Sequence, residues 1–212
     1  MGAQLQLALD AVGYDQAMGL VAEVEPHIDI LELGTPFLFL NGLDALRQFG
    51  ERFPRLAVLS DCKIMDGGGP MAEYSLVRGA RYVTVLAVAD DQVLADAQEA
   101  ASVAGAAVVA DLIACPDPVK RAQELHQLGV DHLCVHGGYG GDLDRTLASA
   151  ERRRAEGPGC WLSVAGGISL GVVDRFAALR PDALVIGSAI TAATDPGRAA
   201  AEFRAAVNGG AW

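Results

Sequence analysis

Basic residues are scarce in this sequence. Its 212 residues include 16 lysines and arginines against 27 aspartates and glutamates, so the formal net charge is −11. The longest basic run is Arg152–Arg154, and no basic stripe alternates with the aromatic residues, which make up 6% of the chain. A surface with this charge repels nucleic acid and anionic membranes. The composition therefore argues against a nucleic-acid-binding or membrane-surface protein.

Long apolar runs and metal-type cysteine spacings are also missing. The longest apolar stretches have the length of a strand, and the first ten residues lack the basic start and apolar core of a signal peptide. The four cysteines match neither a zinc-binding nor a Cys-x-x-Cys spacing; they are Cys62, Cys115, Cys134 and Cys160. We therefore expect free, mostly buried thiols in a cytoplasmic enzyme.

What the sequence does contain is a repeat of strand-like and helix-like segments. Its length and its hydrophobic content of 51% suit one domain, predicted to span residues 1–212. Short runs of Val, Leu and Ile recur about every 25 residues and predict strands at 5–10, 28–33, 56–61, 81–87, 106–112, 131–136, 160–165 and 182–187. Segments of helical periodicity lie at 15–25, 42–50, 70–79, 91–104, 117–128, 143–155, 169–179 and 196–208.

Eight such units predict an α/β fold, a (β/α)₈ or TIM barrel in a single domain. The alternative is an open doubly wound sheet, which usually carries a glycine fingerprint after its first strand. The residues at that place, Leu9–Val12, include no glycine. The barrel is therefore the favoured architecture.

Polar side chains fall at the predicted carboxyl ends of the strands, where barrel enzymes build their active sites. These candidates are Asp10, Glu32, Asp61, Lys63, Asp111 and His136. The other histidines precede strands, open a strand or lie on a helix, and we expect them to be structural or solvent-exposed; they are His27, His126 and His132. His136 is therefore the histidine predicted to act in catalysis.

The segment Asp61–Asp66 carries the densest group of charges. Strand alternation predicts that Asp61 and Lys63 point into the barrel mouth and that Cys62 points to the helices. A carboxylate and an ammonium group there keep each other ionised, so Lys63 could neutralise an oxyanion while Asp61 holds a metal ion. Asp66 follows on a loop. The alternative is a surface ion pair at a loop.

Glu32 and Asp61 are expected on adjacent strands, where two carboxylates could bind Mg²⁺. Such an ion would stabilise an enediolate, and Asp111 and His136 could exchange the proton. The alternative for Asp111 is a buried carboxylate with satisfied hydrogen bonds.

Glycine-rich turns follow the last two predicted strands. Backbone N–H groups in such turns can converge on a phosphate. The candidate phosphate-binding residues are Gly166, Gly167, Gly187 and Ser188. For either turn alone, the alternative is a glycine that only permits a tight turn.

These motifs resemble the orotidine 5′-monophosphate decarboxylase superfamily. The Asp-x-Lys-x-x-Asp pattern at 61–66 is typical of the superfamily, and Glu-Leu-Gly-Thr-Pro at 32–36 is similar to its 3-hexulose-6-phosphate synthases and their sister 3-keto-L-gulonate-6-phosphate decarboxylases. Asp111 and Ala165 resemble the synthases, whereas the decarboxylases have glutamate and threonine there. Tyr139 stands where the decarboxylases have arginine.

The resemblance implies a lyase of the ribulose monophosphate pathway, which uses Mg²⁺ to join D-ribulose 5-phosphate and formaldehyde into D-arabino-hex-3-ulose 6-phosphate. It also implies that Glu32 and Asp61 bind the magnesium and that Lys63 stabilises the enediolate. Asp66 would enter the partner subunit's site in a homodimer. The catalytic set implied in this way is Asp10, Lys63, Asp66, Asp111 and His136.

Two loops depart from the family pattern: Gly67–Met71, and Gly137–Asp142, which we expect to act as a lid. They change the walls of the site, so a different sugar phosphate or electrophile remains open. The alternative functions are a related decarboxylase or epimerase, and a barrel that binds a phosphosugar without turnover. The crowding of so many charged candidates argues against the last of these.

Overall fold

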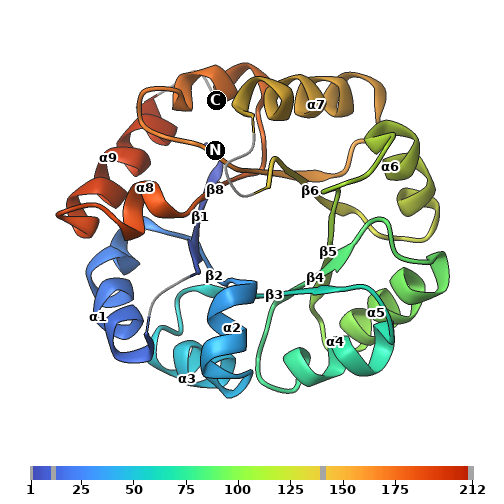
Figure 1. The fold of residues 1–212 in the computed structure, drawn as a ribbon, viewed down its shortest axis with the longest axis horizontal. Coiled ribbons are helices and arrows are strands. Elements are labelled where there is room, and N and C mark those ends of the chain that lie inside the picture. Colours follow the sequence, from blue (N-terminus) through green and yellow to red (C-terminus); the bar gives the residue numbers. More distant parts are fainter. Residues whose placement is uncertain (1, 11–12, 139–141, 210–212) are drawn as a thin grey trace.

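Eight parallel strands form a closed barrel surrounded by helices in the computed structural model of the chain, which describes residues 2–10, 13–138 and 142–209 (Figure 1). The strands are β1 (Gln4–Leu9), β2 (Ile30–Leu33), β3 (Ala57–Ile64), β4 (Tyr82–Leu86), β5 (Ala107–Asp111), β6 (His132–His136), β7 (Trp161–Ala165) and β8 (Ala183–Ile186). Each strand pairs with the next in sequence, and β8 pairs with β1. The predicted (β/α)₈ barrel is confirmed, whereas the boundaries 1–212 stay a prediction.

Besides the short 3₁₀ helix η1, the helices outside the barrel differ from the predicted ones in three places. They are α1 (Tyr14–Val24), η1 (Glu25–His27), α2 (Thr35–Asn41), α3 (Asp44–Arg52), α4 (Gly68–Leu76), α5 (Asp91–Val103), α6 (Pro118–Gln127), α7 (Leu143–Glu156), η2 (Val173–Leu179), α8 (Ser188–Thr191) and α9 (Pro196–Gly209). Helices α2 and α8 were not predicted, and the helix expected at 169–179 is the 3₁₀ helix η2. Helix α2 has Pro36 in its first turn and ends at Asn41, directly before Gly42, which has a φ of 78°.

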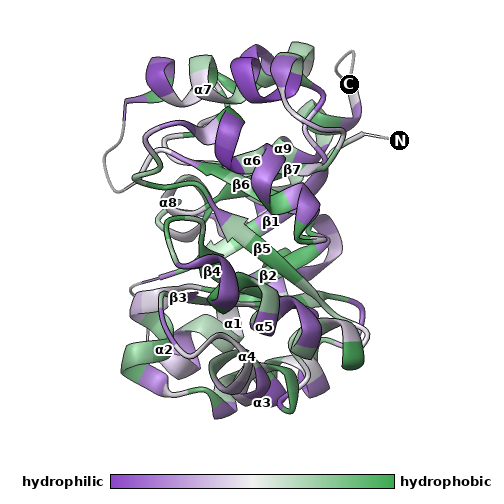
Figure 2. Cartoon of the chain, turned by 90° about the vertical axis from the view of Figure 1, so that its right-hand side faces the viewer, coloured by the Kyte–Doolittle hydropathy of each residue, from purple (hydrophilic) through white to green (hydrophobic). Residues whose placement is uncertain are grey.

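Strand alternation separates two apolar layers. In β1, Leu5, Leu7 and Leu9 pack toward the helices, so Gln6 between them faces the barrel interior. The interior layer contains Ile30, Leu59, Val109 and Ala183. Figure 2 shows the barrel from the side, with hydrophobic β2 and β5 in the middle and helices of mixed polarity around them. The same alternation turns Glu32 and Asp61 inward.

The expectation of mostly buried thiols is wrong for three of the four cysteines. All four cysteines are free. Cys160 is buried, and the other three are half-buried. Within the described parts of the chain, no helix has the length and apolar character needed to cross a membrane.

The glycine run after β3 allows α4 and α5 to approach closely. Gly67 is left-handed, with a φ of 65°, and α4 starts at Gly68. A Cβ atom on Gly68 would lie 1.9 Å from the carbonyl oxygen of Val93 on α5. The two helices can therefore keep this contact only with glycine at position 68.

We expect Gly68→Ala to destabilise the protein by about 1–3 kcal/mol, because the methyl group forces the backbones of α4 and α5 apart. Gly69→Ala is the matched control: its Cβ would have its nearest neighbour, the carbonyl oxygen of Asp96, at 3.6 Å. The free energy of unfolding in urea measures both. Equal stability of the two variants would contradict this packing.

Candidate active site

Asp61, at the carboxyl end of the barrel, accepts hydrogen bonds from three neighbouring side chains. It is 4% exposed. Its Oδ1 accepts hydrogen bonds from Lys63 Nζ at 3.0 Å and from Thr84 Oγ1 at 2.8 Å, and its Oδ2 accepts one from Thr35 Oγ1 at 2.9 Å. These donors hold the ionised carboxylate in one orientation.

Lys63 bridges two carboxylates from different strands. Its Nζ lies 3.0 Å from Asp61 Oδ1 on β3 and 3.0 Å from Asp111 Oδ2 on β5. Burial alone would lower the pKa of Lys63, but the charges and hydrogen bonds of the two carboxylates hold that pKa above its usual range. Lys63 is therefore a fixed cation and not a proton acceptor at neutral pH.

A distortion of β3 places this lysine. The pairing register of β3 and β4 shifts between Ser60 and Ile64, and Lys63 has a left-handed φ of 46°. The Lys63 N–H donates to Thr84 Oγ1 at 2.9 Å. Thr84 thus holds both the strained backbone of Lys63 and the carboxylate of Asp61. The predicted direction of Cys62 also agrees, because its Sγ lies 3.5 Å from Ser75 Oγ on α4.

Asp111 joins the lysine to His136. It is 2% exposed, and its Oδ2 lies 3.1 Å from His136 Nδ1 while its Oδ1 accepts from the Ile113 N–H at 2.9 Å. Burial raises the pKa of Asp111, but the hydrogen bond from His136 and the charge of Lys63 outweigh it, so that pKa lies below its usual range. An ionised carboxylate only accepts hydrogen bonds, so His136 Nδ1 is the donor, which leaves Nε2 as the ring nitrogen that can accept a proton.

The carboxyl group of Glu32 lies beside this group and is repelled by the negative charge of Asp61. Gln6 Nε2 donates to its Oε2 at 2.5 Å. Burial and the negative charge of Asp61 raise the pKa of Glu32 to about 8, in spite of the Gln6 hydrogen bond and the positive charge of Lys63. The buried Oε1 of Gln6 has no hydrogen-bond partner among the residues that the structure describes.

The oxygen atoms of these residues fit a hard divalent cation. Mg²⁺ prefers carboxylate and amide oxygens and usually keeps several waters. The carboxylates of Glu32 and Asp61 repel each other. The Oε1 atom of Gln6, which has no partner among the described residues, adds an uncharged metal-ligand atom beside Glu32. A cation held by Glu32 and Asp61 would remove the repulsion.

Asp10 and the glycine turns line the same end of the barrel. A Cβ on Gly34 would lie 2.2 Å from Asp10 Oδ1, and one on Gly187 would lie 4.0 Å from Asp10 Oδ2. The Asp10 carboxylate therefore lies against the loops that follow β2 and β8.

The two candidate phosphate turns are neighbours because β7 pairs with β8, with Ala165 opposite Val185. Gly166 and Gly167 have left-handed φ values of 108° and 67°, and Gly187 and Ser188 lead into the first turn of α8. The first N–H groups of a helix lack acceptors within it.

Asp66 does not join this hydrogen-bonded group in the described chain. It is exposed, and its Oδ1 accepts from the Gly67 N–H at 2.7 Å. The predicted lid at 137–142 includes residues 139–141, and these lie outside the described residues. Tyr139 is one of them.

Sequence reasoning missed Gln6, Thr35 and Thr84. Each has a recognisable signal: Gln6 and Thr84 are polar residues within apolar strands, and Thr35 opens the turn after Glu32. Two of the other histidines contact residues outside this group. His132 packs against Tyr82 and Trp161 inside the barrel, and His126 pairs with Asp131.

The raised pKa of Glu32 predicts a pH effect on stability in the presence of EDTA. The folded chain holds a proton that the unfolded chain releases above about pH 4.5, so stability should fall by roughly 2–4 kcal/mol from about pH 5 to about pH 8. Glu32→Gln should remove most of this loss, as measured by urea unfolding at both ends of that range. An equal loss in the variant would show that Glu32 does not cause it.

A closed barrel with an ammonium group between two buried carboxylates, one of them bonded to a histidine, defines an enzyme of electrostatic and acid–base chemistry. Residues 3–203 match the model of the orotidine 5′-phosphate decarboxylase / HUMPS family, and the chain belongs to that family. With its curated relatives taken into account, it is an enzyme of the aldehyde-lyase type.

The relatives are similar over nearly their whole length. The 3-hexulose-6-phosphate synthase of Bacillus subtilis (strain 168) is 36% identical over 95% of this chain and 97% of its own. A crystal structure of 3-hexulose-6-phosphate synthase from Salmonella typhimurium is also 36% identical, with a TM-score of 0.89 over 97% of this chain and 99% of that one. The crystal structure of KGPDC from Streptococcus mutans has a TM-score of 0.89 over 98% of each chain; at 24% identity it supports the fold alone.

Proposed function

We propose that this protein is a magnesium-dependent 3-hexulose-6-phosphate synthase. It would join D-ribulose 5-phosphate and formaldehyde through an enediolate to give D-arabino-hex-3-ulose 6-phosphate. The observation that carries the proposal is the Lys63 ammonium group held between Asp61 and Asp111, with His136 bonded to the same Asp111 oxygen. The curated names of relatives at 36% identity support the choice of reaction.

The proton chemistry follows from the hydrogen bonds of the site. His136 Nε2 would take a proton from C1 of the sugar, and the Asp111 carboxylate would stabilise the imidazolium that forms. Lys63 would neutralise the negative charge that develops on the sugar oxygen. The C1 carbon then attacks the formaldehyde carbon, a new carbon–carbon bond forms, and the former formaldehyde oxygen takes up a proton.

Glu32 and Asp61 would hold Mg²⁺ in this proposal. When bound, the ion would supply positive charge next to the substrate oxygens and lower the pKa of the C1 proton. The raised pKa of Glu32 supports this assignment, because a carboxyl group that repels its neighbour gains most from a cation.

The turns at Gly166–Gly167 and Gly187–Ser188 would bind the substrate phosphate through backbone N–H groups. Their position on adjacent strands supports a shared phosphate site. The Asp10 carboxylate, which lies against the loops after β2 and β8, would contact the sugar part of the substrate.

Exposed apolar side chains support a homodimer with shared active sites. They lie on α2, on α4 with the residue after it, and next to Asp66, and they are Phe39, Leu40, Met65, Met71, Tyr74 and Val77. Large exposed apolar areas commonly mark protein interfaces. In such a dimer, the exposed Asp66 would reach the site of the partner subunit. The four free cysteines support a cytoplasmic location.

The test is product formation by the purified protein with D-ribulose 5-phosphate, formaldehyde and Mg²⁺. We expect one hexulose phosphate for each formaldehyde consumed, and loss of turnover after EDTA that Mg²⁺ restores. If formaldehyde is not consumed and 3-keto-L-gulonate 6-phosphate is decarboxylated instead, the protein is the sister decarboxylase. Turnover unaffected by EDTA would overturn the magnesium assignment.

A further inference from the structure

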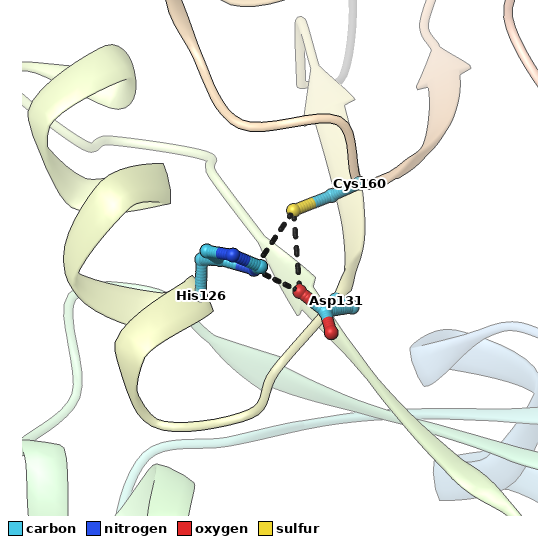
Figure 3. Close-up of side chains that lie close together, drawn as sticks. All are labelled: His126, Asp131 and Cys160. Carbon is cyan, nitrogen blue, oxygen red and sulfur yellow. Dashed lines mark hydrogen bonds and ion pairs between the residues drawn. The ribbon is translucent and has the colours of Figure 1, made fainter.

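A second group of reactive side chains lies at the opposite, amino-terminal end of the barrel (Figure 3). His126 is in the last turn of α6, Asp131 precedes β6, and Cys160 precedes β7. His126 Nδ1 lies 2.5 Å from Asp131 Oδ1, and Cys160 Sγ lies 3.4 Å from the same oxygen and 3.9 Å from His126 Nδ1. These three side chains belong to neither the proposed catalytic set nor the proposed magnesium site.

We propose that His126, Asp131 and Cys160 bind a transition-metal ion of the zinc type. An imidazole nitrogen, a thiolate and a carboxylate oxygen are the ligands that Zn²⁺ takes in proteins. The thiolate selects such an ion over Mg²⁺, which prefers oxygen ligands. The three ligand atoms all lie within 4.8 Å of one another.

The distances suit a tetrahedral ion after a small movement. Ligand atoms around tetrahedral Zn²⁺ are separated by about 3.3–3.6 Å, given the usual bond lengths. The two distances that involve sulfur are already close to this range. Only the nitrogen–oxygen distance must open, and both of those side chains are exposed, with exposed fractions of 54% for His126 and 53% for Asp131.

A buried arginine lies beside the sulfur atom of Cys160. Arg153 on α7 is 1% exposed, and its Nη1 donates to the carbonyl oxygen of Pro158 at 2.8 Å. Its Nε and Nη2 have no hydrogen-bond partner within the described part of the chain. Burial and Asp131 raise the pKa of the Cys160 thiol to about 11, although the charge of Arg153 lowers it. The metal ion itself would therefore have to displace the thiol proton.

Within the described residues, the unpartnered Nε and Nη2 of this buried cation carry three N–H groups, which favour a nearby anion. A neutral thiol is only a weak acceptor, whereas a metal-bound thiolate accepts hydrogen bonds from groups around the site. Metal binding would therefore give Arg153 a stronger hydrogen-bond acceptor at Cys160 than the neutral thiol. The ion would also tie the loop before β6 to the start of β7, and the exposed side of the site leaves a fourth position for water.

Titration of the purified full-length protein with Co²⁺ tests this site. Cobalt bound to a thiolate absorbs in the near ultraviolet by charge transfer, and a site built only of oxygen ligands does not. We expect this absorption to saturate at one Co²⁺ per chain and to disappear on addition of Zn²⁺ but not of excess Mg²⁺. Glu32→Gln should leave it unchanged, which separates this site from the proposed magnesium site.

Variants decide whether the three residues are the ligands. Cys160→Ser should abolish the absorption, and His126→Ala should weaken Co²⁺ binding at least tenfold while leaving the buried thiol and the fold in place. Cys115→Ser, which changes a cysteine after β5 at the other end of the barrel, is the matched control and should bind Co²⁺ as the unaltered chain does. Absence of the absorption, or its persistence at full strength in His126→Ala, would overturn the proposal and leave an ordinary ion pair.

Discussion

Replacing Lys63 with methionine should lower kcat by roughly 10³-fold, because the cation that faces the developing negative charge is lost. Lys63 makes the ion pairs with both Asp61 and Asp111, so no other side chain of this group supplies that charge. The measurement is steady-state synthesis of the hexulose phosphate at saturating substrate. Circular dichroism and the unfolding midpoint should show that the barrel still forms.

Lys120→Met is the matched control for this experiment. Lys120 is an exposed lysine on α6 whose ion pair with Glu124 is one turn away in the same helix, and its loss should change kcat by less than twofold. A Lys63→Met protein that keeps more than a tenth of the wild-type kcat would contradict the proposed role of this cation.

Mixing two inactive variants should restore activity if the sites are shared between subunits. Asp66→Ala and Lys63→Met would each disable every site of their own homodimer. In a hybrid dimer, one site carries both changes and the other carries neither. Random reassortment should therefore recover about one quarter of the wild-type activity.

Co-refolding of the two variants, followed by the same synthesis assay, measures this recovery. Refolding each variant alone is the control and should give background activity. If the mixture stays inactive while hybrids are present by mass spectrometry, Asp66 acts within its own subunit. A fully active Asp66→Ala protein would remove Asp66 from the site altogether.

The barrel could be predicted from the sequence because its signal is repeated eight times. Every predicted strand has a counterpart within two residues at its start, and β3 extends three residues further than expected, to Ile64. Helix α2 was missed because its apolar segment, Phe37–Leu40, directly follows β2 and lacks a polar face. The helix expected at 169–179 is shorter and has 3₁₀ geometry.

The charged part of the candidate site could be predicted because the carboxyl ends of parallel strands meet at one end of a barrel. The residues around it could not, since their contacts depend on strand register. Thr84 reaches Asp61 through the shifted register of β3 and β4, and Gln6 reaches Glu32 across the pairing of β1 and β2. The left-handed backbone of Lys63 has no signal in the residue type of the lysine or of its neighbours.

The group of His126, Asp131 and Cys160 at the other end of the barrel could not be predicted from the sequence either. Asp131 is five residues from His126 and 29 residues from Cys160, a spacing that matches no known motif of metal ligands. The residues meet because β6 and β7 are paired with His132 opposite Trp161, which brings the chain segments before both strands together. Only the closed barrel reveals the group.

Exchange of the C1 protons of D-ribulose 5-phosphate in D₂O, followed by NMR, tests the enediolate chemistry most directly. With Mg²⁺ and no formaldehyde, one C1 proton should exchange stereospecifically, and Lys63→Met should abolish this exchange. Addition of formaldehyde should then convert the labelled sugar into the hexulose phosphate. An unaltered protein that makes the product from formaldehyde without ever exchanging C1, or that shows no exchange under any of these conditions, would contradict an enediolate formed by Lys63, Asp111 and His136.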